Sequence, residues 1–280
     1  RAAQQAERLS RLLFQFMARF VKTAPFFFSG GYTLPMTMTF PPELLSFLRA
    51  STRVAALTGA GVSQESGLRT FRDAQVGIWA QYRPEDLATP EAFERNPRLV
   101  WDFYATRREG AGEAQPNAGH LALAGMEKRF SQFTLITQNI DGLHQRAGSR
   151  NLIELHGNLR RIRCSRGCGV IDEWDELPEV VPACPKCGSP LRPDVVWFGE
   201  NLPEDGLQAA IAAANTCQVF FSIGTSGLVQ PAASLAFWAK KRGAVLVEIN
   251  YEPTPLSEHV DYAFHGKSGE ILPALLVALA

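Results

Sequence analysis

The sequence has no net charge, no long apolar run and few cysteines. Its 280 residues carry 28 basic and 28 acidic side chains, so the broad attraction that holds a nucleic acid is missing and we expect no nucleic acid partner. No apolar run approaches the length of a membrane span, so we expect a soluble protein without a membrane partner. Four of the five cysteines lie in two tight pairs. Such pairs are typical of metal ligands rather than of an extracellular disulfide framework, which indicates a reducing compartment, the cytoplasm.

The composition, 46% apolar and 20% charged, is that of a globular protein with one large core and a smaller lobe. Residues 1–41 differ, because apolar residues such as Leu9 and Phe16 recur there at helical spacing within a basic segment. Three interpretations stay open: an organelle transit peptide, a partner-binding or membrane-surface helix, or upstream sequence outside the working protein. We favour the last, with the start at Met36 or Met38, because the aromatic and glycine segment that follows has no helical continuation.

Four short apolar runs end in polar or glycine-rich residues, and helix-compatible stretches such as 118–129 and 231–242 lie between them. This alternation predicts an α/β fold with a doubly wound parallel sheet. Ligands of such sheets bind outside the carboxyl ends of the strands, so the residues after the four runs are expected to share one crevice. The runs are 54–58, 133–137, 219–223 and 244–249.

The first run ends in the glycine-rich turn Gly59 to Asp73, GAGVSQESGLRTFRD. Backbone N–H groups at such a turn suit a phosphate, which predicts a dinucleotide loop. A plain structural turn is an equal alternative for this segment alone, because Gln64 stands where the usual fingerprint has Gly or Ala. The second run ends in Gln-Asn-Ile-Asp at 138–141. Three hydrogen-bonding side chains in four residues exceed what a turn requires, which predicts a chemical role.

The two cysteine pairs are separated by fifteen residues. Pairs at this separation predict a tetrahedral zinc site of four thiolates, whose closed shell leaves no position for substrate. The predicted ligands are Cys164, Cys168, Cys184 and Cys187. Cys217 stands alone and is interpreted as a packing residue.

Among the five histidines, His156 follows a short apolar run and precedes a glycine. A histidine at a strand end facing a crevice is a candidate general base, because its ordinary pKa lies near neutrality. A surface or satisfied structural role is favoured for His120, His144, His259 and His265.

The motifs taken in order resemble the motif series of the sirtuins. They are GAGVS at 59–63, GLRTFR at 67–72, TQNID at 137–141, HG at 156–157, the cysteine pairs, VVWFGE at 195–200 and GTS at 224–226. The resemblance covers about residues 43–279 and implies an NAD-dependent protein-lysine deacylase with a Rossmann-like domain and a small zinc-binding and helical lobe. The implied boundaries are an N-terminal extension at 1–41, a Rossmann-like domain at 42–72, 130–160 and 194–280, and a small lobe comprising a helical insertion at 73–129 and a zinc module at 161–193.

The resemblance also implies roles for individual residues. His156, Asn139 and Asp141 would be catalytic, with Asp141 gripping the nicotinamide carboxamide. The implied NAD-binding set is Gly59, Ala60, Gly61, Ser63, Thr70, Phe71, Arg72, Trp79, Gln138, Asn139, Ile140, Asp141, Gly224, Thr225, Ser226, Asn250 and Ser268. The implied substrate-binding set is Tyr104, Arg107, Val196, Trp197, Phe198, Gly199 and Glu200.

The implied reaction starts with attack of the acyl-lysine amide oxygen on the ribose carbon, which displaces nicotinamide. His156 then takes a proton from a ribose hydroxyl, and the neighbouring hydroxyl attacks the imidate carbon. The products are free lysine, nicotinamide and O-acyl-ADP-ribose. The acylated protein would bind as an added strand against residues 195–200 and the loop at Gly227. One structural zinc ion and a monomer are expected.

Tyr104 and Arg107 share one face of a predicted helix. Taken alone, they would be a solvated helix face with a packed tyrosine. The pair resembles the Tyr-x-x-Arg of the class III sirtuins, which remove acidic acyl groups, and a guanidinium fork with a phenol suits the carboxylate of succinyl- or malonyl-lysine. Thr70 and the small Ala88 fit the same class. The resemblance, not geometry, favours Arg107 over Arg108.

Two other functions stay open beside a deacylase that acts mainly on acetyl groups. One is a nucleotide sensor or ADP-ribosyltransferase that uses the NAD site to modify protein. The other is a zinc-stabilised interaction module without catalysis. Asn139, Asp141 and His156, all intact, favour deacylation. Turnover of an acylated peptide separates a deacylase from an ADP-ribosyltransferase, and a His156→Tyr variant with an unchanged phenotype would support the interaction module.

Overall fold

The computed structural model describes residues 38–68, 79, 81–171 and 180–280. Residues 38–280 form one compact unit, and residues 1–37 are a separate unit. The helix expected near the N-terminus therefore lies outside the described residues, as do Thr70, Phe71 and Arg72. No helix in the described part of the chain is long and apolar enough to cross a membrane.

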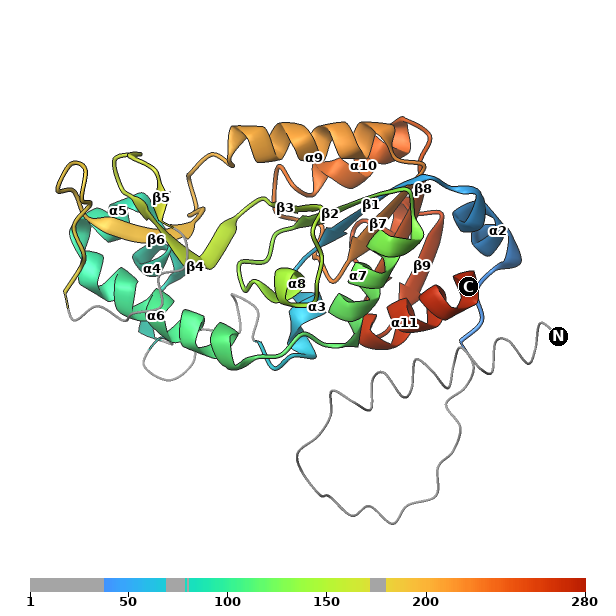
Figure 1. Ribbon diagram of the computed structural model, residues 1–280, viewed down its shortest axis with the longest axis horizontal. Coiled ribbons are helices and arrows are strands. Elements are labelled where there is room, and N and C mark those ends of the chain that lie inside the picture. Colours follow the sequence, from blue (N-terminus) through green and yellow to red (C-terminus); the bar gives the residue numbers. More distant parts are fainter. Residues whose placement is uncertain (1–37, 69–78, 80, 172–179) are drawn as a thin grey trace, which may run out of the picture. The chain divides into compact units, whose positions relative to one another are not determined.

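A six-stranded parallel sheet with the order β3-β2-β1-β7-β8-β9 forms the centre of the larger domain (Figure 1). The chain starts in the middle at β1, moves outward to β3, and returns to β7 beside β1. This reversal confirms the doubly wound, Rossmann-like fold, with its switch point between β1 and β7. The strands are β1 (Arg53–Thr58), β2 (Gln132–Thr137), β3 (Leu152–Glu154), β7 (Val219–Ile223), β8 (Val245–Asn250) and β9 (Tyr262–His265).

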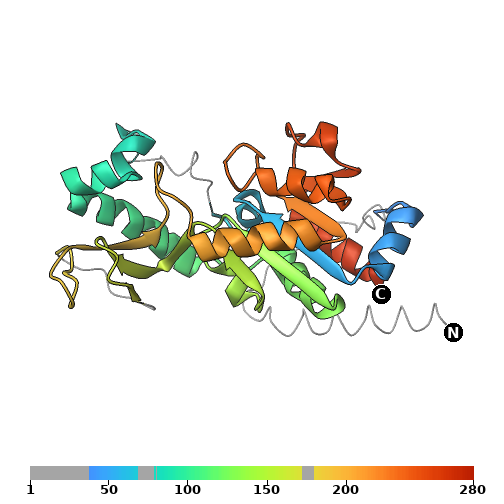
Figure 2. The same cartoon turned by 90° about the horizontal axis from the view of Figure 1, so that it is seen from above.

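Helices cover both faces of this sheet. Strand β7 is buried along its whole length, and β1 is buried after Arg53, which is why both strands appear in the sequence as continuous apolar runs. One face packs against α2 (Pro42–Ala50), α7 (Ala118–Arg129) and α11 (Ser268–Leu279). The other packs against α9 (Glu204–Thr216) and α10 (Ser234–Lys241), with α9 crossing the sheet in Figure 2.

A second, antiparallel sheet of order β5-β4-β6 packs with three helices around a core of its own. Its strands are β4 (Gly157–Cys164), β5 (Val170–Ile171) and β6 (Leu191–Val195), and its helices are α4 (Pro84–Leu87), α5 (Pro90–Arg95) and α6 (Pro97–Glu113). Strand β4 begins directly after His156. The candidate base therefore lies where the chain passes from one sheet to the other.

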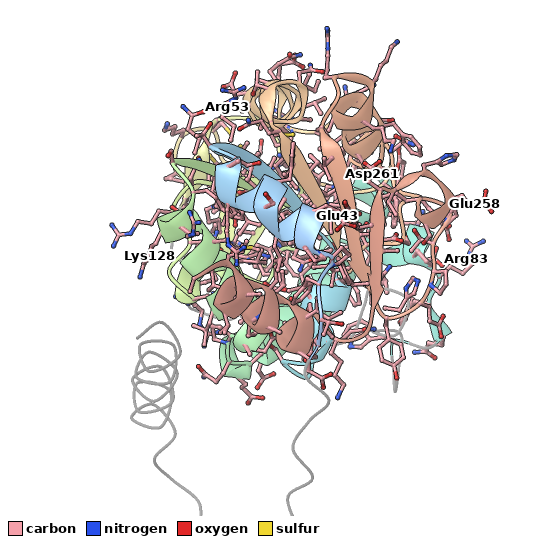
Figure 3. All side chains as sticks on the ribbon, turned by 90° about the vertical axis from the view of Figure 1, so that its right-hand side faces the viewer. Glu43, Arg53, Arg83, Lys128, Glu258 and Asp261 are labelled. Atoms are coloured by element: carbon pink, nitrogen blue, oxygen red, sulfur yellow. The ribbon has the colours of Figure 1, made fainter. Side chains whose placement is uncertain are left out.

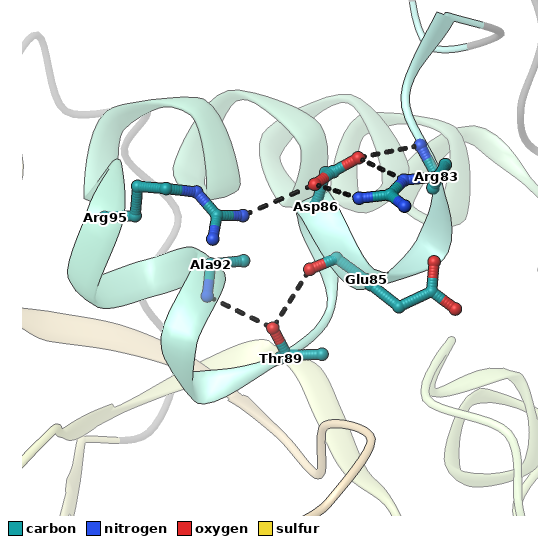
Figure 4. A network of polar contacts seen from close by, with 6 residues as sticks. All are labelled: Arg83, Glu85, Asp86, Thr89, Ala92 and Arg95. Atoms are coloured by element: carbon teal, nitrogen blue, oxygen red, sulfur yellow. Dashed lines mark hydrogen bonds and ion pairs between the residues drawn. The ribbon is translucent and has the colours of Figure 1, made fainter.

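The turn between α4 and α5 is held by a polar network (Figure 4). Asp86 accepts hydrogen bonds from Arg83 at 3.1 Å and Arg95 at 3.4 Å. The turn contains Ala88, whose carbonyl oxygen accepts a 3.0 Å hydrogen bond from the amide of Phe198. The helical insertion is thereby tied to the segment expected to bind the acylated peptide.

The opposite edge of the large sheet, where its strands begin, carries structural contacts. Asp261, which is labelled in Figure 3, accepts hydrogen bonds from Lys240 at 2.7 Å and from the amide of Leu246 at 2.8 Å. Arg53, also labelled there, lies beside a cavity of about 600 Å³ that Cys217 lines too. This cavity lies at the edge away from the crevice that the sequence predicts.

Candidate active site

The glycine turns after β1 and β7 pack against each other at the switch point. The amide of Gly61 donates a 2.8 Å hydrogen bond to the carbonyl of Gly224, and the amide of Gly59 donates to that of Ile223 at 3.0 Å. A Cβ on Gly224 would lie 2.5 Å from the nitrogen of Val62, and Gly224 has a φ of +60°. These glycines thus allow two loops to touch. The N–H groups of Gly59 and Gly61 are used inside the protein, and the cofactor-binding role of these two glycines stays a prediction.

A buried polar cluster lies behind these turns. Ser63, in the short helix α3 (Gly61–Gln64), donates a 2.7 Å hydrogen bond to Oδ2 of Asp141. Asn139 donates through Nδ2 to the Ser63 hydroxyl at 3.2 Å and to the carbonyl of Gly59 at 3.0 Å. Two regions far apart in the sequence therefore meet here, and Ser63 faces a carboxylate rather than an open crevice.

Asp141 is the acidic group of this cluster. Burial raises the pKa of its carboxyl, while the amide of Leu143, the hydroxyl of Ser63 and the charges of Arg107 and Arg146 act against that rise. Asp141 also lines a cavity of about 250 Å³ bounded by α6, α8 (Leu143–Arg146) and β4. A carboxylate held by two donors beside a cavity can accept a hydrogen bond from a ligand amide.

His120 and His144 form a buried pair beneath the cluster. Their ring centroids lie 4.8 Å apart, His120 lies 3.4 Å from Ser63 Oγ, and His144 lies 2.9 Å from Thr58 Oγ1. Burial lowers the pKa of His120 to about 4 and, together with the charge of His120, that of His144 to about 3. A surface role is therefore wrong for both, and the structural alternative stands.

His156 is half-buried at the end of the segment that follows β3. Its Nδ1 lies 2.9 Å from the carbonyl oxygen of Gln138. A carbonyl only accepts, so Nδ1 carries the hydrogen and Nε2 keeps its lone pair. Burial lowers the pKa of His156, although the bond to Gln138 opposes this shift. The ring is thus held in the tautomer that can take a proton at Nε2.

Polar side chains link the carboxyl ends of β2, β7 and β8, as the sequence predicted. Gln138 donates to the Thr225 hydroxyl at 3.1 Å, and Asn250 donates to the Thr225 carbonyl at 3.0 Å. Ser226 beside them is exposed. Ser268 lies apart from this group, at the start of α11, where its hydroxyl donates to Glu65 at 3.1 Å.

An aromatic cluster on α6 contains the expected acyl-binding residues. Tyr104 is buried and packs on Phe103, which in turn packs on Trp79, with ring centroids 5.1 Å and 5.4 Å apart. Burial raises the pKa of the Tyr104 hydroxyl to about 12, and the charge of Arg107 opposes this rise. Burial also lowers the pKa of Arg107, and the charges of Tyr104 and Asp141 oppose this fall. Tyr104 and Arg107 therefore affect each other's pKa, and the charge of Asp141 in the polar cluster also affects the pKa of Arg107. Ile140 packs against the same aromatic core.

Most backbone donors of the expected peptide-binding segment are already used. The amide of Val196 donates to the carbonyl of His156 at 2.9 Å, that of Trp197 to Glu200 at 2.9 Å, and that of Phe198 to the carbonyl of Ala88. Gly199 follows with a φ of +86°. An added strand would therefore pair with a segment that is itself anchored at several points.

The four cysteines predicted as metal ligands come together in the antiparallel sheet. Their sulfur atoms all lie within 4.8 Å of one another, and those of Cys164 and Cys187 are 3.5 Å apart. A tetrahedral zinc ion with bonds of about 2.3 Å separates its sulfur ligands by about 3.8 Å. The four cysteines are therefore positioned to bind one zinc ion. Cys217 lies apart in the large domain, where burial raises the pKa of its thiol to about 12.

Sequence reasoning missed Arg192, a buried arginine in β6. Its guanidinium bonds Glu200 at 2.6 Å and lies 3.2 Å from the ring centroid of Trp197. The signal in the sequence was weak: an arginine eight residues before an acid, in a strand, LRPDV, that does not form an apolar run.

Comparison with known proteins agrees with this geometry. A model described as Sir2 family matches residues 59–231. An NAD-dependent protein deacylase from Aquifex aeolicus (strain VF5) is 52% identical over 217 residues, which cover 77% of this chain and 90% of that protein. The crystal structure of a Sir2 homolog–NAD complex is 46% identical and covers 86% of this chain and 94% of that one, with a TM-score of 0.81. A Sir2–p53 peptide–NAD+ structure is 33% identical and covers 84% and 96%, with a TM-score of 0.74. The chain belongs to the Sir2 family, the sirtuins.

Proposed function

We propose that this protein is an NAD-dependent protein-lysine deacylase that removes succinyl and malonyl groups, and also acetyl groups, from lysine side chains. Names and complexes of its relatives support NAD-dependent deacylation of proteins. The observation that carries the acidic acyl preference is the buried Tyr104 with the partly buried Arg107 one turn further along α6, where the charge of Asp141 also acts on Arg107.

The residues present fit an NAD site. Gln138, Thr225 and Asn250 offer hydrogen-bonding groups across three strand ends, and the carboxylate of Asp141 offers an acceptor for a carboxamide. Bound NAD would supply a ribose carbon that accepts the acyl oxygen when nicotinamide leaves. Asn139, whose Nδ2 is held by Gly59 and Ser63, would contact the ribose.

His156 acts as the general base in this proposal. The carbonyl of Gln138 fixes its Nδ1 hydrogen, so Nε2 is the atom that takes a proton from a ribose hydroxyl. The lowered pKa of His156 keeps this nitrogen unprotonated at neutral pH. A cationic imidazole would have no lone pair to offer.

The acyl preference follows from the chemistry of the pair on α6. A guanidinium is a fixed cation with donors in a fork, and a phenol whose pKa is raised stays protonated as a donor. Together they suit the terminal carboxylate of succinyl- or malonyl-lysine, and the partial burial of Arg107 strengthens the attraction. An acetyl group has no carboxylate and leaves this interaction unused.

The experiment is mass-spectrometric turnover of matched succinyl-lysine and acetyl-lysine peptides with NAD, for wild type, Arg107→Met and Arg108→Met. We expect wild type to prefer the succinyl peptide and Arg107→Met to lose that preference while still removing acetyl. Arg108→Met, a neighbour on the same helix, is expected to keep the wild-type ratio. A wild type that prefers acetyl would make the protein mainly a deacetylase, and a lost preference in Arg108→Met alone would identify the wrong arginine.

A further inference from the structure

Trp197 carries a buried donor that the fold does not use. Its side chain is 2% exposed, and its Nε1–H has no hydrogen-bond partner within the described ranges. By contrast, the buried indole of Trp101 in the same core donates to the carbonyl of Leu191 at 2.9 Å. A buried N–H without an acceptor is costly and uncommon, so an acceptor from a ligand would relieve it.

The indole of Trp197 is fixed in place by a cation that packs on one face of its ring. The guanidinium of Arg192 lies 3.2 Å from the ring centroid and is itself held by Glu200, at 2.6 Å and 2.9 Å, and by the carbonyl of Val195 at 2.8 Å. Glu200 also accepts the backbone amide of Trp197 at 2.9 Å. The ring therefore cannot turn to find an acceptor elsewhere, and its N–H keeps one direction.

Tyr104, an expected acyl-binding residue, lies beside this ring. The ring centroids of Tyr104 and Trp197 lie 6.4 Å apart. Burial raises the pKa of the Tyr104 hydroxyl. The charge of Arg107 lowers this pKa most, and a polar interaction with the Trp197 side chain lowers it next. The N–H thus acts on the Tyr104 hydroxyl without a hydrogen bond of acceptable geometry to it. The indole of Trp197 and the phenol of Tyr104 thus lie together in one buried core, on the helix-facing side that also carries Arg107.

The charges behind the indole also favour an anion. Arg163 and Arg192 share the single carboxylate of Glu200, at 3.2 Å and 2.6 Å, which leaves one positive charge in excess. A cation over the face of an aromatic ring is attracted by its π electrons, and it draws density from the ring and strengthens the N–H as a donor.

We propose that the indole N–H of Trp197 is a third donor for the terminal carboxylate of an acidic acyl group, which makes Trp197 a specificity-determining residue. The inference rests on the acyl preference proposed above. Arg192 and Glu200 act in it as positioning residues, because they hold the ring without touching the acyl group. A carboxylate has lone pairs for all three donors, whereas an acetyl methyl group offers none.

The first test compares Trp197→Phe, which removes the N–H and keeps an aromatic ring, with Trp101→Phe as the matched control. We expect the succinyl-to-acetyl ratio of kcat/KM to fall about tenfold in Trp197→Phe, the loss typical of one hydrogen bond to a charged group. The ratio should stay at the wild-type value in Trp101→Phe. Melting temperature should fall in both variants, because each puts a smaller ring into the core, and it should fall further in Trp101→Phe, which also leaves the Leu191 carbonyl without its donor.

A second test needs only the wild-type protein. Five tryptophans give five indole N–H signals in a ¹H–¹⁵N spectrum, and the signal of Trp197 can be assigned from sequential connectivities. A succinyl-lysine peptide should move this signal downfield, as a new hydrogen bond does, and an acetyl-lysine peptide should not.

The outcomes separate this inference from the function on which it rests. A wild type that prefers succinyl, combined with an unchanged ratio in Trp197→Phe, overturns the role of Trp197 and leaves the acyl preference intact. A larger fall of the melting temperature in Trp197→Phe than in Trp101→Phe, or equal shifts with both peptides, assigns the N–H to the fold and also overturns it. A wild type that prefers acetyl removes the acyl preference and the inference together.

Discussion

The hydroxyl of Ser63 donates a 2.7 Å hydrogen bond to Oδ2 of Asp141, 78 positions away in the sequence. Asn139 donates to the same hydroxyl oxygen at 3.2 Å. The glycine turn after β1 and the polar segment after β2 are therefore joined through side chains, and the charge of Asp141 depends on a residue of the other loop. This dependence can be measured.

Ser63→Ala should shift the pH dependence of the reaction. The Ser63 hydroxyl stabilises the ionised form of Asp141 and, with the Leu143 amide, opposes the burial that raises the pKa of this carboxyl. Without the hydroxyl the pKa of Asp141 rises further, so the acid limb of kcat/KM should move to higher pH. Deacylation rates between pH 5 and 9 measure this, with Ser234→Ala on α10 as the control. An acid limb at the same pH in Ser63→Ala would show that the ionisation of Asp141 does not limit the rate.

The buried histidines should make the fold sensitive to acid. The folded-state pKa values of His120 and His144, about 4 and 3, lie below the ordinary value of 6.5. As the pH falls, these histidines take up protons in the unfolded chain before they do so in the folded protein. The two histidines therefore contribute fully to the free energy of unfolding above pH 6.5, and this contribution is smaller by about 2 kcal/mol for each histidine at pH 5. Thermal melts at pH 7 and pH 5 should show this loss, and His144→Gln should reduce it. The exposed His259→Gln should leave it unchanged, and equal pH dependence in all three proteins would contradict the account.

Zinc should hold the smaller domain together. A zinc ion held by four thiolates would join the end of β4 to the segment before β6, so Cys164→Ser should lower the melting temperature and the zinc content together, from one ion per chain towards none. Cys217→Ser is the matched control, because its buried thiol lies outside the cluster, and it should keep one zinc ion. Metal analysis beside thermal melts provides the measurement. One zinc ion retained in Cys164→Ser would mean that this cysteine is not a ligand.

Gly157 should tolerate no side chain. It has a φ of +80°, and a Cβ there would lie 2.0 Å from the carbonyl oxygen of Asp194 across the β4–β6 pair. Gly157→Ala should therefore cost about 3 kcal/mol or more in the free energy of unfolding. Gly148→Ala measures the cost of the backbone conformation alone, since Gly148 has a φ of +101° and no atom lies within 4 Å of its Cβ position. That variant should cost about 1–2 kcal/mol. If denaturant titrations gave the same loss of unfolding free energy for both variants, the predicted clash with the Asp194 carbonyl would be contradicted.

Much of the fold could be predicted from the sequence because local signals were strong. Strand β7 has the predicted bounds, since a strand buried on both faces is one apolar run between polar ends. Helix α7 also has the predicted bounds, because Asn117 caps its first turn with its side chain. Strand β9 was missed, as it is short and only half-buried along its length.

The contacts that build the site could not be predicted in the same way. His120 and His144 have polar neighbours along the chain, and they become buried because α7 and α8 pack against each other and against Ser63 and Thr58. The stacking of Arg192 on Trp197 depends on the path of the chain after β6. Motif resemblance supplied candidate roles, while tertiary structure decides which groups share a hydrogen bond or a charge.

Lysine deacylation by this protein should consume NAD. The number of nicotinamide molecules released for each lysine freed tests this most directly. With a succinyl-lysine or acetyl-lysine peptide, we predict one nicotinamide per lysine and ADP-ribose only on a small-molecule product carrying the acyl group. His156→Asn should slow the formation of free lysine at least about a hundredfold. Nicotinamide release without free lysine, with ADP-ribose attached to protein, would contradict deacylation and identify an ADP-ribosyltransferase instead.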